Sequence, residues 1–235
     1  VINKGVTEED FTRAVTYAFN EGWSTVKLYF MIGLPTEKDE DVLQIKDLAY
    51  KVKDIFFSMP KENRKGNFNV TVSAACFVPK PFTPFQWIGQ NSIDEFYTKI
   101  KLLRDNIKDR KVTFNYHDPR LSYLEAVLAR GDRKVGRALI KAWEKGCKFD
   151  GWSDLFKYEK WIEALKEAGI DGDFYALRHR KYEEILPWDF IDVGVSKSYL
   201  IKENEKAINE ELTRDCRLGC NACGINDGFI GGVCN

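Results

Sequence analysis

Residues 25–50 read TVKLYFMIGLPTEKDEDVLQIKDLAY and contain the pattern that decides the fold. The first eight are an almost continuous apolar run, interrupted by Lys27, which is typical of a strand buried on both faces of a parallel sheet. The sequence Gly-Leu-Pro then turns the chain. Thr36 with Asp39 forms a capping-box pattern, and apolar residues recur at helical spacing as far as Phe56. The stretch therefore predicts a strand, a tight turn and a long helix.

The same alternation of strand and helix extends to both sides of this unit. Residues 7–22 predict an amphipathic helix that begins at a Thr7 capping box. Downstream, residues 68–77 and 111–116 predict two further strands, and residues 92–107 predict the helix between them. Strands joined by helices through short connections indicate a parallel sheet, which is part of either a doubly wound sheet or a barrel. Three strands cannot close a barrel alone.

After these strands the pattern changes to helices alone. From His117 onward, Asp118-Pro119 is typical of a helix start, and several further helical patterns follow without a clear strand. We therefore expect an α/β part over residues 1–116, an all-helical extension over residues 117–212 and a Cys-rich, metal-binding tail over residues 213–235.

The tail contains four of the six cysteines, namely Cys216, Cys220, Cys223 and Cys234. The first three follow a Cys-x3-Cys-x2-Cys spacing, and the glycines around them let the backbone fold so that the thiolates converge on one metal. An iron–sulfur cluster and a zinc ion both suit this set. A disulfide or a cluster of free thiols is the less favoured alternative, because we expect a reducing compartment.

Composition limits the classes of partner. The chain has 235 residues with 36 Lys or Arg and 36 Asp or Glu, so no net charge attracts nucleic acid or a membrane. Two local basic faces, at Arg133, Lys134 and Arg137 and at residues 178–181, are either solvated or grip RNA phosphates. Without a signal peptide or a long apolar run, we expect a cytoplasmic protein with no membrane partner. The chain opens at Val1 without Met, and we expect a piece of a longer protein.

Two segments resemble a known enzyme superfamily. Residues 31–37, MIGLPTE, and residues 77–87, FVPKPFTPFQW, resemble the fifth and sixth strand ends of radical SAM enzymes. The most similar subgroup is uncharacterised and has a cobalamin-binding-type domain ahead of the barrel. Residues 124–133, 146–152 and 186–189 resemble the C-terminal extension of that subgroup.

This resemblance implies the C-terminal part of a partial (βα)6 radical SAM barrel, followed by the helical extension and the metal-binding tail. Such enzymes bind S-adenosylmethionine on a 4Fe-4S cluster and cleave it reductively to a 5′-deoxyadenosyl radical. By resemblance, Ile32 and Gly33 would lie against the adenosine, and Phe77 and Val78 would meet the adenine edge. Both contacts would lie at the carboxyl end of the barrel.

The sequence departs from the family pattern in two places. The family's cluster motif follows the first barrel strand, whereas this chain has that spacing at Cys216, Cys220 and Cys223. We interpret the tail as a site for an auxiliary iron–sulfur cluster or zinc, separate from the cluster that cleaves S-adenosylmethionine. A common family form also has glycine where Thr36 stands.

We therefore expect a fragment of a radical SAM iron–sulfur enzyme, inactive by itself, whose substrate is unknown. Its partner would be the missing N-terminal half of the same protein, and cobalamin is a candidate further cofactor. The alternative is a zinc-containing RNA-binding module without catalytic activity. In either case the exposed edge of an incomplete sheet predicts self-association.

Overall fold

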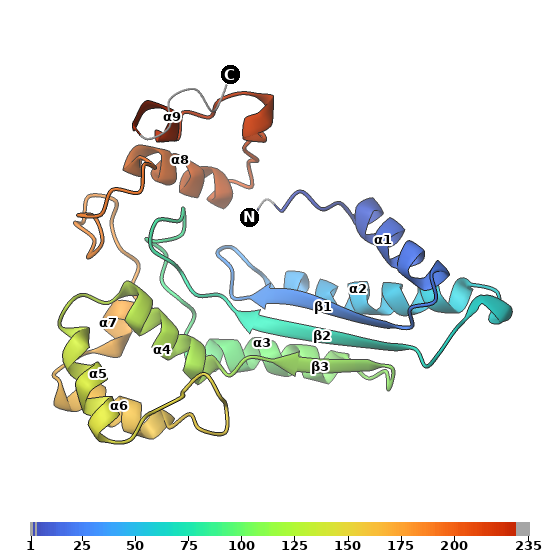
Figure 1. The fold of residues 1–235 in the computed structure, drawn as a ribbon, viewed down its shortest axis with the longest axis horizontal. Helices are drawn as coiled ribbons and strands as arrows, with labels where there is room; N and C mark the ends of the chain where they lie inside the picture. The colour runs from blue at the N-terminus through green and yellow to red at the C-terminus, as the bar shows by residue number, and fades with distance from the viewer. Residues whose placement is uncertain (1, 3, 229–235) are drawn as a thin grey trace. The chain divides into compact units, whose positions relative to one another are not determined.

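The computed structural model describes residue 2 and residues 4–228. Contacts divide the chain into two compact units (Figure 1). The sheet unit comprises Lys4–Phe77 and Ile93–Pro119, and the helical unit comprises Val78–Ser92 and the chain from Arg120 onward. Because this division reflects contacts alone, the predicted boundaries between barrel part, extension and tail stay predictions.

Three helices and three strands build the sheet unit, with one short 3-10 helix. Their order is α1 (Glu8–Asn20), β1 (Thr25–Ile32), α2 (Asp39–Ser58), η1 (Lys61–Asn63), β2 (Asn69–Cys76), α3 (Ile93–Asn106) and β3 (Val112–Tyr116).

The sheet has the strand order β1-β2-β3, and both pairs of neighbours are parallel. Thr25 lies opposite Asn69 and Ile32 opposite Cys76, so β1 and β2 are aligned along their whole length. The expected α/β class with a parallel sheet is thereby confirmed. The sheet is open, since β1 and β3 each have one neighbour within the described unit. Self-association across these edges stays a prediction.

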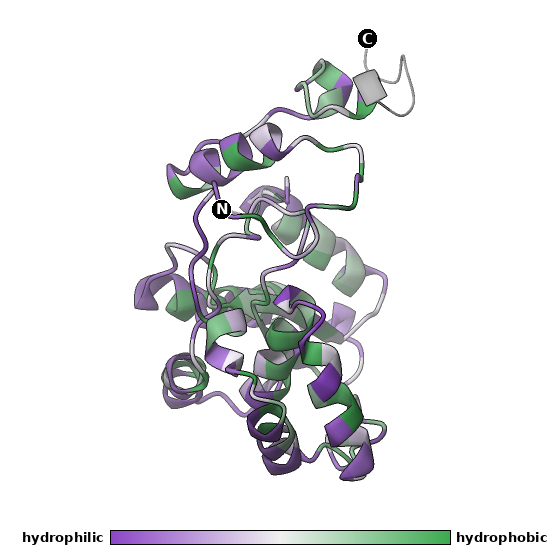
Figure 2. Cartoon of the chain, turned by 90° about the vertical axis from the view of Figure 1, so that its left-hand side faces the viewer, coloured by the Kyte–Doolittle hydropathy of each residue, from purple (hydrophilic) through white to green (hydrophobic). Residues whose placement is uncertain are grey.

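One face of the sheet is packed against α1, α2 and α3. Alternate strand residues, such as Leu28 and Val72, join residues of all three helices in one hydrophobic core. At one end of this core the ring of Phe56 lies 5.1 Å from that of Phe19 and 4.8 Å from that of Phe68. The helices have hydrophilic and hydrophobic residues on different sides (Figure 2), as their predicted periodicity requires.

None of these three helices packs against the other face of the sheet. Tyr29 is 70% exposed and Met31 37% exposed, so the prediction that β1 is buried on both faces is wrong for this unit. Successive strand residues point to opposite faces, and the helices occupy only one. The residues of the second face are mostly polar or small: Thr25, Lys27, Tyr29, Met31, Asn69, Thr71, Ser73, Ala75, Thr113 and Asn115.

Of the two predicted capping boxes, one is present and the other is absent. The Thr7 capping box is present, because the Thr7 side chain accepts from the Asp10 backbone and the Asp10 carboxylate accepts from the Thr7 N–H. The predicted Thr36 capping box is wrong. Helix α2 begins at Asp39, and the Lys38 N–H donates to Asp41 at 2.8 Å. Thr36 belongs to the preceding turn, where its backbone has φ +66°.

The helical unit contains seven short helices in the described residues. They are α4 (Pro119–Arg130, whose first residue falls in the sheet unit), α5 (Val135–Glu144), α6 (Tyr158–Glu167), α7 (Gly172–Ala176), α8 (Lys197–Ile208), η2 (Cys216–Leu218) and α9 (Ile225–Gly228).

A buried arginine, Arg130, forms hydrogen bonds that link α4 to the segment at the end of α7. Arg130 donates to the backbone oxygens of Ala176 and Arg178, while Arg180 donates to the oxygen of Arg130 at 2.7 Å. Burial, together with the charges of Arg180 and Arg178, lowers the pKa of Arg130 to about 10. Arg130 thus donates to the carbonyl oxygen of Ala176, the last residue of α7, and to that of Arg178 just beyond the helix. Across the described residues, no helix combines the length and apolar character needed to cross a membrane.

Candidate functional site at the carboxyl edge of the sheet

The carboxyl ends of the strands are joined by backbone hydrogen bonds beyond the strands themselves. The Phe77 N–H donates to the Ile32 oxygen at 2.8 Å, and the His117 N–H donates to the Ala74 oxygen at 3.0 Å. The thiol of Cys76 donates to the His117 oxygen, with 3.8 Å between sulfur and oxygen. The segments that leave the three strands therefore begin side by side at one edge, where ligands bind in open sheets and barrels.

Two of the predicted adenosine contacts lie at this edge. The side chain of Ile32 is fully buried in the core against the helices, so only its backbone faces away from the core. Gly33 has φ +81°, in the left-handed region where a side chain is strained. The backbone of this turn is what a ligand would approach.

The side chain of Glu37 holds the turn after β1 in shape. Its carboxylate accepts from the Gly33 N–H at 2.8 Å and from the Leu34 N–H at 3.5 Å. It also lies 2.9 Å from the ammonium nitrogen of Lys99 on α3, with side-chain exposures of 9% and 13%. The turn is thus anchored to the neighbouring helix by a buried ion pair.

Lys99 is a residue that the sequence analysis missed. On α3 it lies one turn from Phe96 and beside Ile100 and Leu103, all of which are buried. A single lysine among the core-facing positions of an amphipathic helix is a signal that it has a buried anionic partner. The sequence alone does not show that this partner is Glu37.

The other predicted contacts divide between the two units. Phe77 is buried in the sheet unit, and its N–H is already used by Ile32. Val78 begins the helical unit and is half-buried. His117 is exposed, and Asp118 accepts from the Tyr97 hydroxyl at 3.4 Å. The predicted contacts of Phe77 and Val78 with the adenine edge stay predictions.

Of the described cysteines of the tail, Cys223 lies at the start of α8. Cys216 and Cys220 are exposed, and the Ser196 N–H donates to the Cys223 oxygen at 2.8 Å. The Ala222 N–H donates to the Cys220 sulfur at 3.3 Å. This backbone donor suits a thiolate that binds a metal, because such hydrogen bonds stabilise the charge on sulfur.

These cysteines are not gathered into one coordination group. Within residues 2 and 4–228, no three His, Cys, Asp or Glu side chains lie together as a metal site requires. The fourth predicted ligand, Cys234, lies outside the described residues. The auxiliary cluster or zinc site therefore stays a prediction, and no chemical step is derived through it.

The second basic run is engaged within the helical unit. Arg178 forms a bidentate ion pair with Glu184 at 2.7 and 2.8 Å. Arg180 is 6% exposed and lies over the Trp188 ring at 5.1 Å. Burial is the largest cause of the lowered pKa of Arg180. These two arginines are thus unsuited to grip phosphates at the surface.

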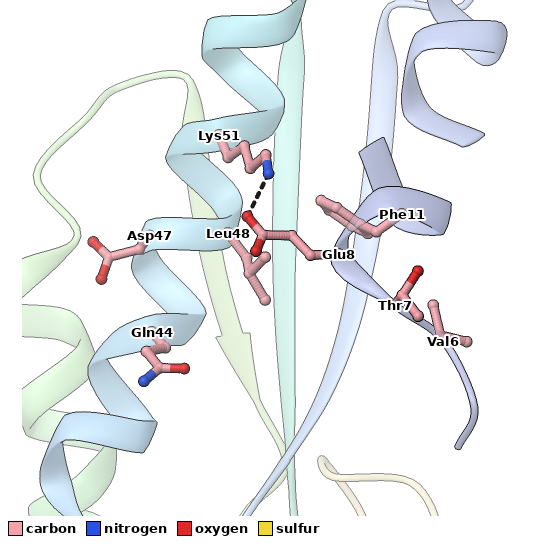
Figure 3. Close-up of a pocket in the computed structure, with 8 residues that line it drawn as sticks. All are labelled: Val6, Thr7, Glu8, Phe11, Gln44, Asp47, Leu48 and Lys51. Atoms are coloured by element: carbon pink, nitrogen blue, oxygen red, sulfur yellow. Dashed lines mark hydrogen bonds and ion pairs between the residues drawn. The ribbon is translucent and has the colours of Figure 1, made fainter. Parts of the chain in front are cut away.

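A separate pocket lies on the helical side of the sheet unit. It has a volume of about 490 Å³ and lies between the start of α1 and the middle of α2. Figure 3 shows the Glu8 carboxylate pointing to the Lys51 ammonium across it, while Asp47 points away. The hydrogen bond from Lys51 lowers the pKa of Glu8. The other residues that line the pocket are Val6, Thr7, Phe11, Gln44 and Leu48.

Comparisons with known proteins give one relative. No protein-family model and no solved structure matches the chain. An uncharacterised protein of Methanocaldococcus jannaschii, MJ0966, is 34% identical over 142 residues. The match covers 59% of this chain and 28% of the archaeal protein. This chain is therefore similar to one segment of a longer archaeal protein whose name assigns no activity.

Proposed function

We propose that the sheet unit is part of a radical SAM barrel and that the carboxyl edge of its sheet binds the adenosine of S-adenosylmethionine. The observation that carries this proposal is the winding of the sheet. Strands β1, β2 and β3 are adjacent in chain order, and α1, α2 and α3 share one core on one face. In a doubly wound sheet the strand order reverses and helices cover both faces, whereas a barrel keeps chain order and has all helices outside.

The polar face of the sheet agrees with the interior of a partial barrel. A second layer of helices would require apolar residues on both faces of parallel strands. Instead, Lys27, Thr71 and Thr113 form one row across the three strands, and Tyr29, Ser73 and Asn115 form the next. Such rows suit a cavity that holds a polar ligand and water.

The turn after β1 would bind the adenosine through its backbone. Gly33 has no side chain that would stand between its backbone and a ligand, and the Glu37 carboxylate fixes the turn by holding two of its amides. Lys99 neutralises that carboxylate, so the turn presents no net charge to the ligand. The 4Fe-4S cluster of such enzymes supplies the electron that cleaves S-adenosylmethionine. Residues 1–215 of this chain contain no three-cysteine motif for it.

The whole protein's activity is part of the same proposal, since the chain matches only 28% of its archaeal relative. The test uses the full protein that contains this chain, purified without oxygen and reconstituted with iron and sulfide. With S-adenosylmethionine and a chemical reductant, we expect release of 5′-deoxyadenosine, measured by liquid chromatography. A protein that binds iron and sulfide yet releases no 5′-deoxyadenosine with any reductant would contradict the proposal.

A further inference from the structure

Three aromatic rings are exposed on the helical unit where α5 ends. Trp143 is 63% exposed on the last turn of α5, Phe149 is 74% exposed in the loop that follows, and Trp152 is 68% exposed. The Trp152 N–H donates to the Phe149 oxygen at 3.0 Å, so a turn keeps the last two close together.

The exposed aromatic residues do not belong to the core face of α5. That face consists of Val135, Ala138 and Ala142, which are buried. Around the helix axis, Trp143 lies about a quarter of a turn from that face and Ile140 less than half a turn from it, given 3.6 residues per turn. Ile140 is also exposed. Within the described residues, helix α5 thus has a second, exposed face that contains a tryptophan.

One cation lies over the Trp143 ring, and two more lie before and in the first turn of α5. Lys148 places its ammonium 5.5 Å from the centre of the Trp143 ring. Arg133 and Arg137 are exposed at the start of α5, and among the described residues neither side chain has an ion-pair partner.

The carboxylates of the neighbouring helix are already used. On α6, Glu167 pairs with Lys145 at 2.8 Å and with Lys141 at 3.6 Å, and Glu163 pairs with Lys145 at 3.4 Å. Glu163 and Glu167 therefore pair with Lys141 and Lys145, and not with Arg133 or Arg137. The unpaired positive charges at Arg133 and Arg137 remain available to an external anion.

We propose that this surface, formed by Arg133, Arg137, Trp143, Lys148, Phe149 and Trp152, binds single-stranded nucleic acid. Exposed rings stack on bases, which all have a π face, and unpaired cations contact the phosphates between them. Arg137 and Trp143 are six residues apart on α5 and about 9 Å apart along its axis, so bases and phosphates of one short strand can engage both.

The charge pattern argues against a lipid surface as the partner. A helix that inserts into a membrane has a wide apolar face with its charges on the opposite side. Here Glu144, Lys148 and Asp150 lie between the aromatic residues in sequence. This inference goes beyond the proposed radical chemistry and does not depend on it.

The test is fluorescence anisotropy of the full chain with fluorescein-labelled oligouridylate and oligothymidylate. We expect the logarithm of the affinity to fall with the logarithm of the salt concentration with a slope of about −2, since three cations contact phosphates. Trp143→Ala and Trp152→Ala should each weaken binding about fivefold or more. Arg133→Gln with Arg137→Gln should weaken binding and make the salt slope shallower.

Matched controls come from the sheet unit. Trp23→Ala removes a tryptophan that is also largely exposed, and Arg110→Gln removes an exposed arginine. Both should bind as the unchanged chain does. Circular dichroism checks that every variant is folded. If a tryptophan variant does not fold, the double variant Arg133→Gln with Arg137→Gln still tests the proposal.

Three results would overturn the proposal. One is the absence of binding to either oligonucleotide at low salt. Another is an equal loss of affinity in the control variants. The third is evidence that something else binds this surface. Such evidence would be binding to anionic phospholipid vesicles without binding to nucleic acid, or a dimer in light scattering that Trp143→Ala converts to a monomer.

Discussion

Lys99 of α3 and Glu37 of the turn after β1 form a buried ion pair, with 2.9 Å between the lysine nitrogen and Oε1 of the carboxylate. The two residues are far apart in the sequence, yet their contact fixes the backbone that follows the first strand of the sheet. The same carboxylate oxygen accepts from the Gly33 N–H at 2.8 Å. The shape of the proposed adenosine site therefore depends on a helix that is contributed by another βα unit.

Replacing Glu37 by Gln should destabilise the sheet unit strongly. The change leaves the Lys99 ammonium buried without an anion, which costs about 3–5 kcal/mol when one partner of a buried pair is removed. Urea denaturation followed by circular dichroism measures the loss. Combining Glu37→Gln with Lys99→Met should recover part of it, because the unpaired charge is then absent.

An exposed ion pair of the helical unit provides the matched control. Lys80 and Glu125 pair at the surface, with side-chain exposures of 46% and 53%. Lys80→Met should change the free energy of unfolding by less than about 1 kcal/mol. If Glu37→Gln costs as little as this control, the buried pair does not have the structural role assigned to it.

Thr36→Gly should stabilise the chain. Thr36 has φ +66°, and a β-branched residue in the left-handed region is strained by about 1–2 kcal/mol, which glycine avoids. After the greater backbone entropy of glycine in the unfolded chain is included, we expect a gain of about 1 kcal/mol or less. Thr113→Gly, in the extended backbone of β3, should instead lower stability. A loss at both positions would show that the Thr36 backbone is unstrained.

The Arg178–Glu184 pair predicts a pH dependence of the helical unit. Hydrogen bonding to Arg178 is the largest cause of the lowered pKa of Glu184. A lowered carboxylate pKa contributes stability that is present above the ordinary value of 4.5 and lost as the pH falls through the folded value. Glu184→Gln should therefore unfold at a lower temperature than the unchanged chain at neutral pH.

The difference between these two chains should shrink in acid, where Glu184 is protonated in both states. Thermal unfolding followed by circular dichroism at neutral and acidic pH measures it. A difference in melting temperature that is the same at both pH values would contradict an ionic contribution from Glu184.

Metal analysis tests the tail. For the full chain purified without oxygen, we expect iron and acid-labile sulfide, both lost when Cys216, Cys220 and Cys223 are changed to Ser. Cys147→Ala is the matched control, because this buried thiol, whose pKa is raised by burial, lies outside the tail. Zinc in place of iron, or no metal at all, would contradict the auxiliary cluster.

Much of the sheet unit could be predicted because its signals are local. The apolar run of β1, the helical spacing of α2 and the Thr7 capping box each depend on neighbours in the sequence. The uncovered face of β1 could not be predicted from this strand alone, because Tyr29 and Met31 lie in an almost continuous apolar run, although the same face is mostly polar on β2 and β3. Burial of a strand face depends on which other elements cover it.

The candidate site was predicted only in part for the same reason. Gly33 was identified from its place at a strand end, but its conformation depends on Glu37 and Lys99, which are brought together by the tertiary fold. The surface at the end of α5 could not be predicted either, because Trp143 is a large apolar residue on an amphipathic helix. It is exposed because small residues, Ala138 and Ala142, form the contact instead.

The most direct measurement of the central claim is the affinity of the reconstituted full protein for S-adenosylmethionine, by isothermal titration calorimetry. The Gly33→Ala variant should bind at least about tenfold more weakly, because its methyl group would occupy the close approach to the adenosine and strain the turn. Gly136→Ala is the control, since a methyl group there meets open space. Equal affinity in the unchanged protein and both variants, or no binding of S-adenosylmethionine to a protein that contains iron and sulfide, would contradict the assignment of this edge.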